Sequence, residues 1–389
     1  MATFYKSIFS IARSQSRMAI FYKSIFSIAA MTLVLTGCSS EVISATPTPV
    51  AYKACMSTSP AGVNDGGVNQ SAYFGLQQAE AQFGVAISVV QASAKPTVGL
   101  YERALQRLIG RGCNLIFAVG GNQNDAVYAK AAANPKTHFV LVDQPPFSVR
   151  TAMQSGDYAN VQSVSFDTTV AAFQAGYLAA SHTKTSTVGV IAGRGDVISQ
   201  AEVWFFRQGV SYFNRFNPAS QVVVIGAADD LSAWWTLPEA ASPAKVKALV
   251  AKLLGLGADV VFPVGVNGLA AAQQVATVPG RVVIGSGSDW YLQARYETVK
   301  PVILSSVHKV VSSEVASLVG SQLSMVSASP QSSTAVASPS PMLPVIAGQV
   351  TLVAEHSVAF GSNVQTTLEQ IAKQIADSTI VLDPFPATV

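Results

Sequence analysis

The sequence predicts an α/β protein of two lobes, each with a largely parallel, doubly wound sheet. Short apolar runs alternate many times with amphipathic stretches, which is the pattern of βαβ units. The runs are continuously apolar rather than alternating, as in strands that are buried on both faces. The chain has 389 residues, more than a typical single domain.

The predicted elements follow one another along almost the whole chain. After a first strand at 52–58, strands are expected at 86–90, 114–120, 138–143, 186–193, 221–227, 258–265, 281–287 and 302–307. Helices are expected at 70–83, 101–112, 124–133, 171–182 and 243–257, and several of them end in glycine. Ordered structure resumes at 345–360, and a last helix is expected near 363–377.

The composition allows a large core and excludes nucleic acid as a partner. Hydrophobic residues make up 49% of the chain and charged residues 12%. The net charge is only +3, and no Lys/Arg cluster is interleaved with aromatic residues. Segment 324–344 stands apart because it is rich in Ser, Pro and Ala without an apolar period, so it is expected to be an exposed loop or linker.

The N-terminus resembles a bacterial lipoprotein signal. About a dozen largely apolar residues at 24–35 follow several basic residues, and this run is too short to span a bilayer. It ends in Leu-Thr-Gly-Cys at Cys38, like the lipobox, whose Cys is lipidated and becomes the mature N-terminus. We therefore expect a signal peptide at 1–37, a flexible tether at 38–50, and a lipid anchor on the extracytoplasmic face of the cell membrane. The alternative is an ordinary signal with a chance Cys.

The same N-terminal region contains a repeat, because MATFYKSIFSIA at 1–12 recurs as MAIFYKSIFSIA at 18–29. Translation could start at Met1 or at Met18. Cleavage before Cys38 removes both copies, so neither is expected in the mature protein.

Two further cysteines, Cys55 and Cys113, lie in or beside predicted strands. An exported protein meets oxidising conditions, so the two could pair. We expect buried free thiols, and the sequence leaves the disulfide open.

Catalytic and cofactor motifs are missing from the sequence. There is no G-x-S-x-G elbow and no G-x-x-x-x-G-K-[ST] loop, and the four histidines are too widely spaced for a metal site. GSGSDW at 285–290 lacks the G-x-G-x-x-G spacing, and the tripeptide at 194–196 is expected to form a turn. We therefore expect no enzymatic activity, cofactor or metal.

Polar residues and glycines follow several predicted strands, at the end where open α/β sheets bind ligands. They are Gly121 and Asn122, Asp143, Gly265 and Asn267, Asp289, and Lys309. Their recurrence at the same end of successive strands predicts a polar ligand cleft.

Seven stretches in order resemble the basic membrane protein family, the substrate-binding lipoproteins of ABC-type nucleoside importers. NDGGVNQSAYFGLQQA at 64–79 is similar to its D-x-S-F-N-Q-x-A-x-x-G pattern. The other stretches are NPKTHFVLVD, SVSFDTTVAAFQAGYLAA, STVGVIAGRGDV, GADVVFPVGVNGLAAAQQ, VVIGSGSDW and VILSSVHKVV. The similarity spans about residues 52–376.

The resemblance implies a periplasmic-binding-protein type I-like fold, in which two Rossmann-like lobes hold a purine nucleoside between them. Lobe 1 is then expected at 51–163, with about 306–345 returning to it. Lobe 2 is expected at 164–305, with about 346–389 returning to it. The partners implied are the nucleoside, an ABC permease, and the membrane through the anchor.

The family's site residues carry over to only some positions. The resemblance implies that Asn69 binds the base, that Asp143 contacts the ligand, and that Lys309 reaches a sugar hydroxyl. Asp289 would keep one carboxylate of the family's D-x-D. A stacking aromatic is expected at Trp234 or Trp235, although both could equally be core residues.

Three positions depart from the family pattern. Val68 stands where the family has a stacking Phe, Ser59 where it has an Asp, and Gly287 where it has the first Asp of the D-x-D. Each lost contact would cost about 1–3 kcal/mol of binding free energy.

The function expected from the sequence is the solute-binding component of an ABC importer, anchored by its lipid, with a nucleoside as ligand. One alternative is a ligand-sensing lipoprotein without a permease. Another is a surface antigen or adhesin with a vestigial cleft, and a hydrolase is a third.

Overall fold

The computed structural model describes residues 52–386 except 94–96, 121–122, 144–157, 229–230, 239, 329–344, 355, 357 and 362. The expected linker at 324–344 therefore lies mostly outside the described residues, as do Cys38 and the whole N-terminal region. In the part of the chain that is described, no helix is both long enough and apolar enough to cross a bilayer.

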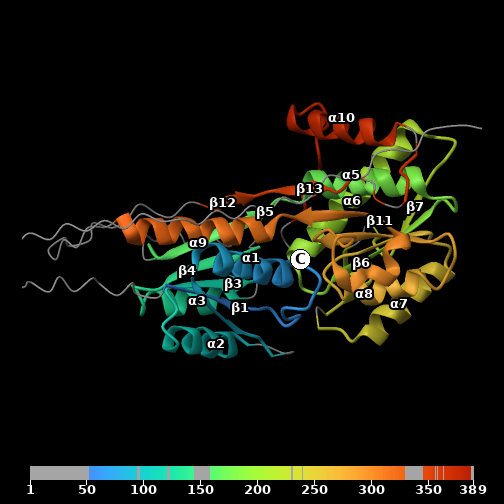
Figure 1. Ribbon diagram of the computed structural model, residues 1–389. Helices are drawn as coiled ribbons and strands as arrows, with labels where there is room; N and C mark the ends of the chain where they lie inside the picture. Colours follow the sequence, from blue (N-terminus) through green and yellow to red (C-terminus); the bar gives the residue numbers. More distant parts are fainter. Residues whose placement is uncertain are drawn as a thin grey trace, which may run out of the picture. The chain divides into compact units, whose positions relative to one another are not determined.

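The first sheet has six parallel strands in the order β12–β5–β4–β3–β1–β2 (Figure 1). Their bounds are Lys53–Ser57 (β1), Ala86–Val90 (β2), Leu115–Val119 (β3), His138–Val142 (β4), Val161–Phe166 (β5) and Val345–Gly348 (β12).

Helices cover both faces of this sheet, which explains its continuously apolar strands. Helices α1 (Val68–Phe83) and α9 (Val311–Ala328) pack on one face, and α2 (Val98–Gly110) and α3 (Asn124–Ala131) pack on the other. Successive residues of β3 pack on opposite faces of the sheet. Phe117 packs with α1 and α9, and Ile116 packs with α2 and α3.

The second sheet has seven strands, in the order β13–β11–β10–β9–β6–β7 with β8 beside β6. All pairs are parallel except β13, which runs antiparallel to β11. The bounds are Thr187–Gly193 (β6), Val223–Ile225 (β7), Thr236–Leu237 (β8), Val260–Pro263 (β9), Val282–Gly287 (β10), Ile303–Lys309 (β11) and Val350–Leu352 (β13).

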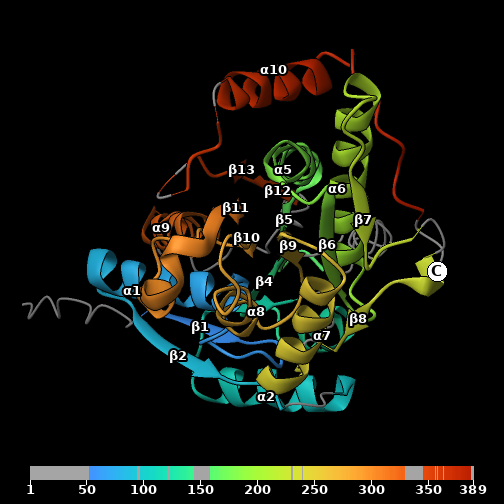
Figure 2. The same ribbon diagram turned by 90° about the vertical axis from the view of Figure 1, so that its right-hand side faces the viewer.

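This sheet is also covered on both faces. Helices α5 (Thr169–His182) and α6 (Val197–Phe216) pack on one face, and α7 (Pro243–Gly255) and α8 (Gly268–Val275) on the other. Glycine lets α5 and α6 approach closely, since a Cβ on Gly176 would lie 1.9 Å from the Phe206 carbonyl oxygen. Helix α10 (Val364–Ala376) packs on α5 (Figure 2). Two 3₁₀ segments, Leu231–Ala233 and Ala294–Val302, complete the lobe.

The chain passes between the two sheets three times. It leaves the first sheet after β5 to form α5, and it leaves the second sheet after β11 to form α9. It crosses a third time between β12 and β13. The predicted fold class, two doubly wound α/β lobes with parallel sheets, is therefore confirmed.

The disulfide between Cys55 and Cys113 corrects the expectation of free thiols. Strands β1 and β3 are neighbours in the sheet, and Cys55 is paired in register with Ile116. Cys113 precedes β3 by two residues, and the two Cα atoms are 6.0 Å apart. Strand order brings the two cysteines together, and the sequence alone does not reveal strand order.

Candidate functional site

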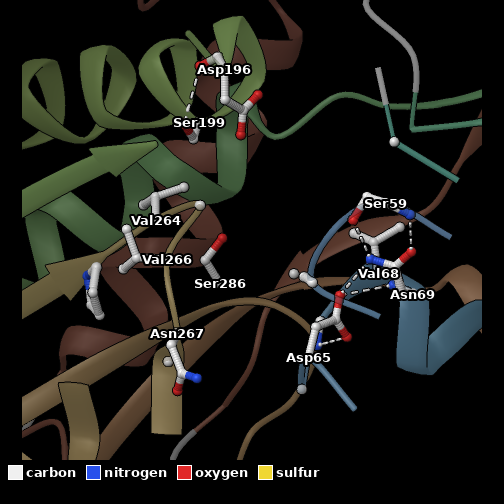
Figure 3. A pocket seen from close by; sticks show the side chains of 18 of the residues that line it. Ser59, Asp65, Val68, Asn69, Asp196, Ser199, Val264, Val266, Asn267 and Ser286 are labelled. Carbon is white, nitrogen blue, oxygen red and sulfur yellow. Dashed lines mark hydrogen bonds between the residues drawn. The ribbon is translucent and has the colours of Figure 1, made fainter. Parts of the chain in front are cut away.

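A cavity of about 570 Å³ lies between the two lobes. Its first-lobe lining follows β1, β3 and β4, and its second-lobe lining follows β6, β9, β10 and β11. Figure 3 shows the two sets of side chains on opposite sides, with Ser59, Asp65, Val68 and Asn69 facing residues of the second lobe. In parallel sheets the carboxyl ends of the strands share one edge, so a cleft forms there.

The loop after β1 is held by Asp65 and Asn69. Asp65 accepts hydrogen bonds from the backbone N–H groups of Gly67 at 2.8 Å and Gln70 at 3.0 Å, which satisfies donors at the start of α1. Asn69 is 3% exposed, and its Nδ2 donates to Ser59 Oγ and to Asp65 Oδ2, each at 2.8 Å. Its Oδ1 accepts from the Ser59 N–H at 2.9 Å, so this amide is engaged on both sides within its own lobe.

An ion pair joins the lobes across the cavity. Lys309 ends β11 in the second lobe, and Asp143 follows β4 in the first. The Lys309 Nζ lies 3.0 Å from Oδ1 and 2.9 Å from Oδ2 of Asp143. The residues are 3% and 8% exposed, so the pair is largely removed from water. Burial lowers the pKa of Lys309, but the carboxylates of Asp143 and Glu202 outweigh it and the net pKa is raised.

Two acidic side chains of the second lobe also face the cavity. Asp196 caps α6, accepting from the Ile198 N–H at 3.1 Å, and burial raises its pKa. Glu202 lies further along α6 and accepts from Ser286 Oγ at 2.6 Å. Burial raises the pKa of Glu202 to about 7, against the opposing effect of Lys309. The sequence did not single out Glu202, because nothing local marks a helical Glu as buried.

Hydrogen bonds join the loop before α1 to the segment after β10, beside the cavity. The Gly66 carbonyl accepts from Ser288 Oγ at 2.5 Å and from Gln293 Nε2 at 3.2 Å. Gln293 Nε2 also donates to Ser288 Oγ at 2.6 Å, and an Arg295 Nη1 donates to the Asn64 carbonyl. We call Gly66, Ser288 and Gln293 the interlobe latch.

The positions that depart from the family pattern do line the cavity. Val68 contributes an aliphatic side chain there, and Ser59 contributes a hydroxyl. Gly287 has φ +86°, and a Cβ on it would lie 3.5 Å from Gly67 Cα and 3.9 Å from Val68 Cγ2. The first-lobe loop therefore occupies the space in front of Gly287, where a larger side chain would project.

The aromatic residues that line the cavity are packed against the protein. The rings of Trp290 and Tyr296 stack on each other, with centroids 4.8 Å apart, and both side chains are buried. Trp290 also packs closely on the backbones of Gly268 and Gly285. These rings are therefore committed to the core of the second lobe.

The structure brings five of the sequence-predicted residues together at the cavity: Asn69, Asp143, Gly265, Asn267 and Lys309. Gly121 and Asn122 lie outside the described residues. Asp289 does not line the cavity; its Oδ2 lies 3.1 Å from His356 Nε2, and its Oδ1 accepts from the Tyr291 N–H.

Trp234 takes the core position, one of the two placements that the sequence left open. It is 6% exposed within the core between the second sheet, α5 and α6, and its Nε1 donates to the Ala228 carbonyl at 2.8 Å. The short turn at Leu231–Ala233 precedes it, and the indole is committed to the core. Trp235 packs in the other core of that lobe, with Lys252 Nζ 4.0 Å from its ring centroid. Neither ring lines the cavity.

Two doubly wound lobes, three crossings and a polar cavity at the strand ends define the two-lobed fold of the periplasmic-binding-protein type I class. Comparison with a solved structure agrees. The ABC transporter system solute-binding protein from Aeropyrum pernix K1 has a TM-score of 0.64 and 16% identity, and the match covers 87% of this chain and 94% of that one. At this identity the likeness shows the fold alone.

The sequence comparison then gives the family. The family described as Bmp, ABC transporter substrate-binding protein PnrA-like, matches residues 52–323. The chain belongs to this family, as the sequence motifs predict.

Two curated relatives are similar over about half of the chain. The ABC transporter nucleoside-binding protein BmpA of Lactococcus lactis subsp. cremoris is 33% identical over 51% of this chain and 58% of its own. The CD4+ T-cell-stimulating antigen of Listeria monocytogenes is 27% identical over 54% of each chain. This chain thus spans little more than half the length of the curated relatives it matches.

No metal-binding group is found among the described residues, where no three His, Cys, Asp or Glu side chains gather closely enough to hold an ion. The polar groups of the cavity are instead suited to hydrogen bonding. Carboxylates accept from hydroxyl and amino groups, and the Lys309 ammonium donates.

Proposed function

We propose that this protein binds a purine nucleoside between its lobes as the solute-binding component of an ABC importer. The observation that carries the proposal is the cavity, to which both lobes contribute polar side chains from strand ends and across which Asp143 pairs with Lys309. Its volume of about 570 Å³ lies in the range of small-molecule sites. The Lactococcus lactis relative is named as a nucleoside-binding protein, which supports this ligand class.

The groups in the cavity match the hydrogen-bonding needs of a nucleoside. Ribose hydroxyls donate well to carboxylates, which Asp143 and the acidic residues of α6 supply. Lys309 can donate to a hydroxyl oxygen, and Asn267 carries an amide suited to the edge of a base. Asn69, whose amide is engaged within the first lobe, positions the loop beside the ligand. Val68 in place of an aromatic ring removes a stacking face, which lowers the expected affinity by about 1–3 kcal/mol.

Binding is proposed to close the lobes about the three crossings, as in other hinged binding proteins. A ligand favours the closed form only through contacts that it gains there. The ion pair and the interlobe latch are the protein's own contacts in the closed form. The closed form would then dock on a permease.

The proposal includes a lipid anchor at Cys38, which would hold the protein on the extracytoplasmic face beside the permease. Residues 38–50 would act as the tether, since they are rich in Ser, Thr and Pro.

The role in import is tested by uptake of radiolabelled adenosine in cells that lack the gene. We expect wild-type protein to restore uptake, and an Asp143→Asn variant to restore much less. A Cys38→Ser variant should lose incorporation of labelled palmitate and release the protein from the membrane. Unchanged adenosine uptake after deletion of the gene would contradict the import role.

A further inference from the structure

Glu202 is a buried acid that faces the cavity from within a helix. It lies in α6, where Val203 and Phe206 belong to the apolar core and Glu202 itself lines the cavity. Only 1% of the residue is exposed. Burying a carboxyl group is costly unless it finds hydrogen-bond partners.

Among the described residues, one of its two carboxyl oxygens has such a partner and the other has none. Ser286 Oγ donates to Oε1 at 2.6 Å, whereas Oε2 has no hydrogen-bond partner among the residues that the structure describes. A buried acceptor without a donor is unfavourable, so a donor that enters the cavity and reaches Oε2 would be bound favourably.

The charged groups that face Glu202 come from three elements. Lys309 at the end of β11 favours the ionised carboxylate, whereas Asp143 after β4 and Asp196 at the start of α6 disfavour it. Both Asp143 oxygens lie within hydrogen-bond distance of the Lys309 ammonium, and among the described residues Glu202 is in no direct ion pair. Burial is the largest effect and raises the pKa of Glu202 to about 7.

We propose that Glu202 is a ligand-binding residue of the second lobe, whose free Oε2 accepts a hydrogen bond from a hydroxyl or amino group of an uncharged nucleoside. This inference rests on the nucleoside binding proposed above and adds a contact that controls affinity through pH. Because the ionised carboxylate is the better acceptor, proton loss from Glu202 strengthens binding.

The size of the pH effect follows from the fraction of Glu202 that is ionised. With a pKa of about 7, roughly a tenth is ionised at pH 6 and nine tenths at pH 8. If the ionised form binds, the apparent Kd scales inversely with that fraction. Adenosine should therefore bind about tenfold more weakly at pH 6 than at pH 8.

The test is calorimetric titration of the purified protein with adenosine, which does not itself titrate in this range, at several pH values between 6 and 8. Four proteins are compared: wild type, Glu202→Gln, Ser286→Ala, and Glu80→Gln as a control on the exposed face of α1. Thermal unfolding of each variant checks that it is folded. Glu202→Gln keeps the shape of the side chain and removes its titration.

We expect the tenfold dependence in wild type and in Glu80→Gln, and a flat profile in Glu202→Gln. Ser286→Ala should move the midpoint of the pH dependence of adenosine affinity to higher pH, because the Ser286 hydrogen bond lowers the pKa of Glu202. A purely structural role for Glu202 would not produce that shift. A wild type that binds adenosine with no pH dependence, or a Glu202→Gln variant with the wild-type profile, overturns this inference alone. A wild type that binds no nucleoside overturns the proposed function and this inference with it.

Discussion

Asp143 and Lys309 neutralise each other in the interior, and each depends on the other being charged. Asp143 has φ +59°, in the left-handed region that Asn also tolerates, so Asp143→Asn removes the charge without straining the backbone. Leaving the Lys309 ammonium buried without its partner should lower the free energy of unfolding by about 3 kcal/mol. Urea denaturation at pH 7 measures this loss.

The matched control for Asp143→Asn is the double variant Asp143→Asn with Lys309→Met. It removes both charges, so most of the lost stability should return while ligand affinity stays low. If Asp143→Asn is as stable as wild type, the ion pair is not the buried, mutually dependent contact described above.

Glu202 makes stability depend on pH. Its pKa is about 7 in the folded protein and 4.5 in the reference state, so the folded protein binds more protons between these values. The free energy of unfolding therefore falls as pH rises from about 4.5 to 7, and the loss persists above 7. Glu202→Gln should be more stable than wild type by about 3 kcal/mol at pH 8, with little of this gain at pH 4.5.

Urea denaturation of wild type and Glu202→Gln at both pH values measures this difference. Subtracting the two proteins cancels the titration of all other groups that the variant leaves unperturbed. A stability difference that is the same at pH 4.5 and pH 8 would show that Glu202 does not titrate as described.

At the residue scale, sequence position predicts the cavity lining where a residue ends a strand or follows it by one or two positions. Asp143, Gly265 and Lys309 line the cavity for this reason. Glu202 was missed because nothing in the local sequence marks a helical Glu as facing a cavity. The placement of Trp234 was left open because a loop tryptophan gives no local sign of whether its ring turns toward the cavity or the core.

At the scale of elements, the Cys55–Cys113 disulfide ties β1 to the segment before β3. It closes a loop of 58 residues, and the chain-entropy relation gives about 4 kcal/mol of stabilisation for a loop of that length. The Cys55→Ala/Cys113→Ala variant should therefore unfold at lower urea, with a loss of about 2–4 kcal/mol.

Reduction offers a second measurement on the wild type. A reducing agent should lower the urea concentration at which wild type unfolds to that of Cys55→Ala/Cys113→Ala. The same agent should leave the unfolding of that variant unchanged. Equal stability of oxidised and reduced wild type would contradict a stabilising disulfide.

The interlobe latch belongs to the same scale, because it links the loop before α1 to the segment after β10. Each hydrogen bond to the Gly66 carbonyl contributes about 1 kcal/mol to the closed form. Ser288→Ala/Gln293→Ala loses both bonds, about 2 kcal/mol, and should therefore reduce the closed population and weaken adenosine binding by up to about thirtyfold. The double variant's radius of gyration, from small-angle scattering of the ligand-free protein, should increase.

A control for the latch is Gln70→Ala, which removes a hydrogen bond within the same first-lobe loop, since Gln70 Oε1 accepts from the Gly66 N–H. An unchanged Kd and radius of gyration in the latch variant would mean that these bonds do not hold the lobes closed.

Elements were predictable where the core demands a continuous apolar run. The strands at 86–90, 114–120 and 281–287 coincide closely with β2, β3 and β10. Strand β5 was not among the predicted runs because polar residues interrupt VQSVSF, although Ser163 is fully buried there. Strand order was not predictable, since pairing between distant segments leaves no local mark in the sequence. The disulfide was not predictable either, because it depends on β1 and β3 being neighbours in the sheet.

At the scale of the whole molecule, the two-lobed fold was predictable from the sequence. The contacts that the two lobes make with each other beside the site were not. The alternation of strands and helices, together with the chain length, predicts two doubly wound sheets. The family motifs predict which strand ends lie at the cavity. Which side chains of the two lobes meet depends on lobe–lobe packing. The Gly66–Ser288 contact and the position of Gly287 against Gly67 arise only from that packing.

The central claim is that a nucleoside binds in the cavity between the lobes. Calorimetric titration of the purified protein with adenosine and guanosine at pH 8 tests it most directly, with Asp143→Asn alongside. We expect wild type to bind one nucleoside per chain. We expect the affinity of Asp143→Asn to be at least tenfold lower. The absence of binding by wild type at about 1 mM nucleoside, or equal affinity in Asp143→Asn, would contradict it.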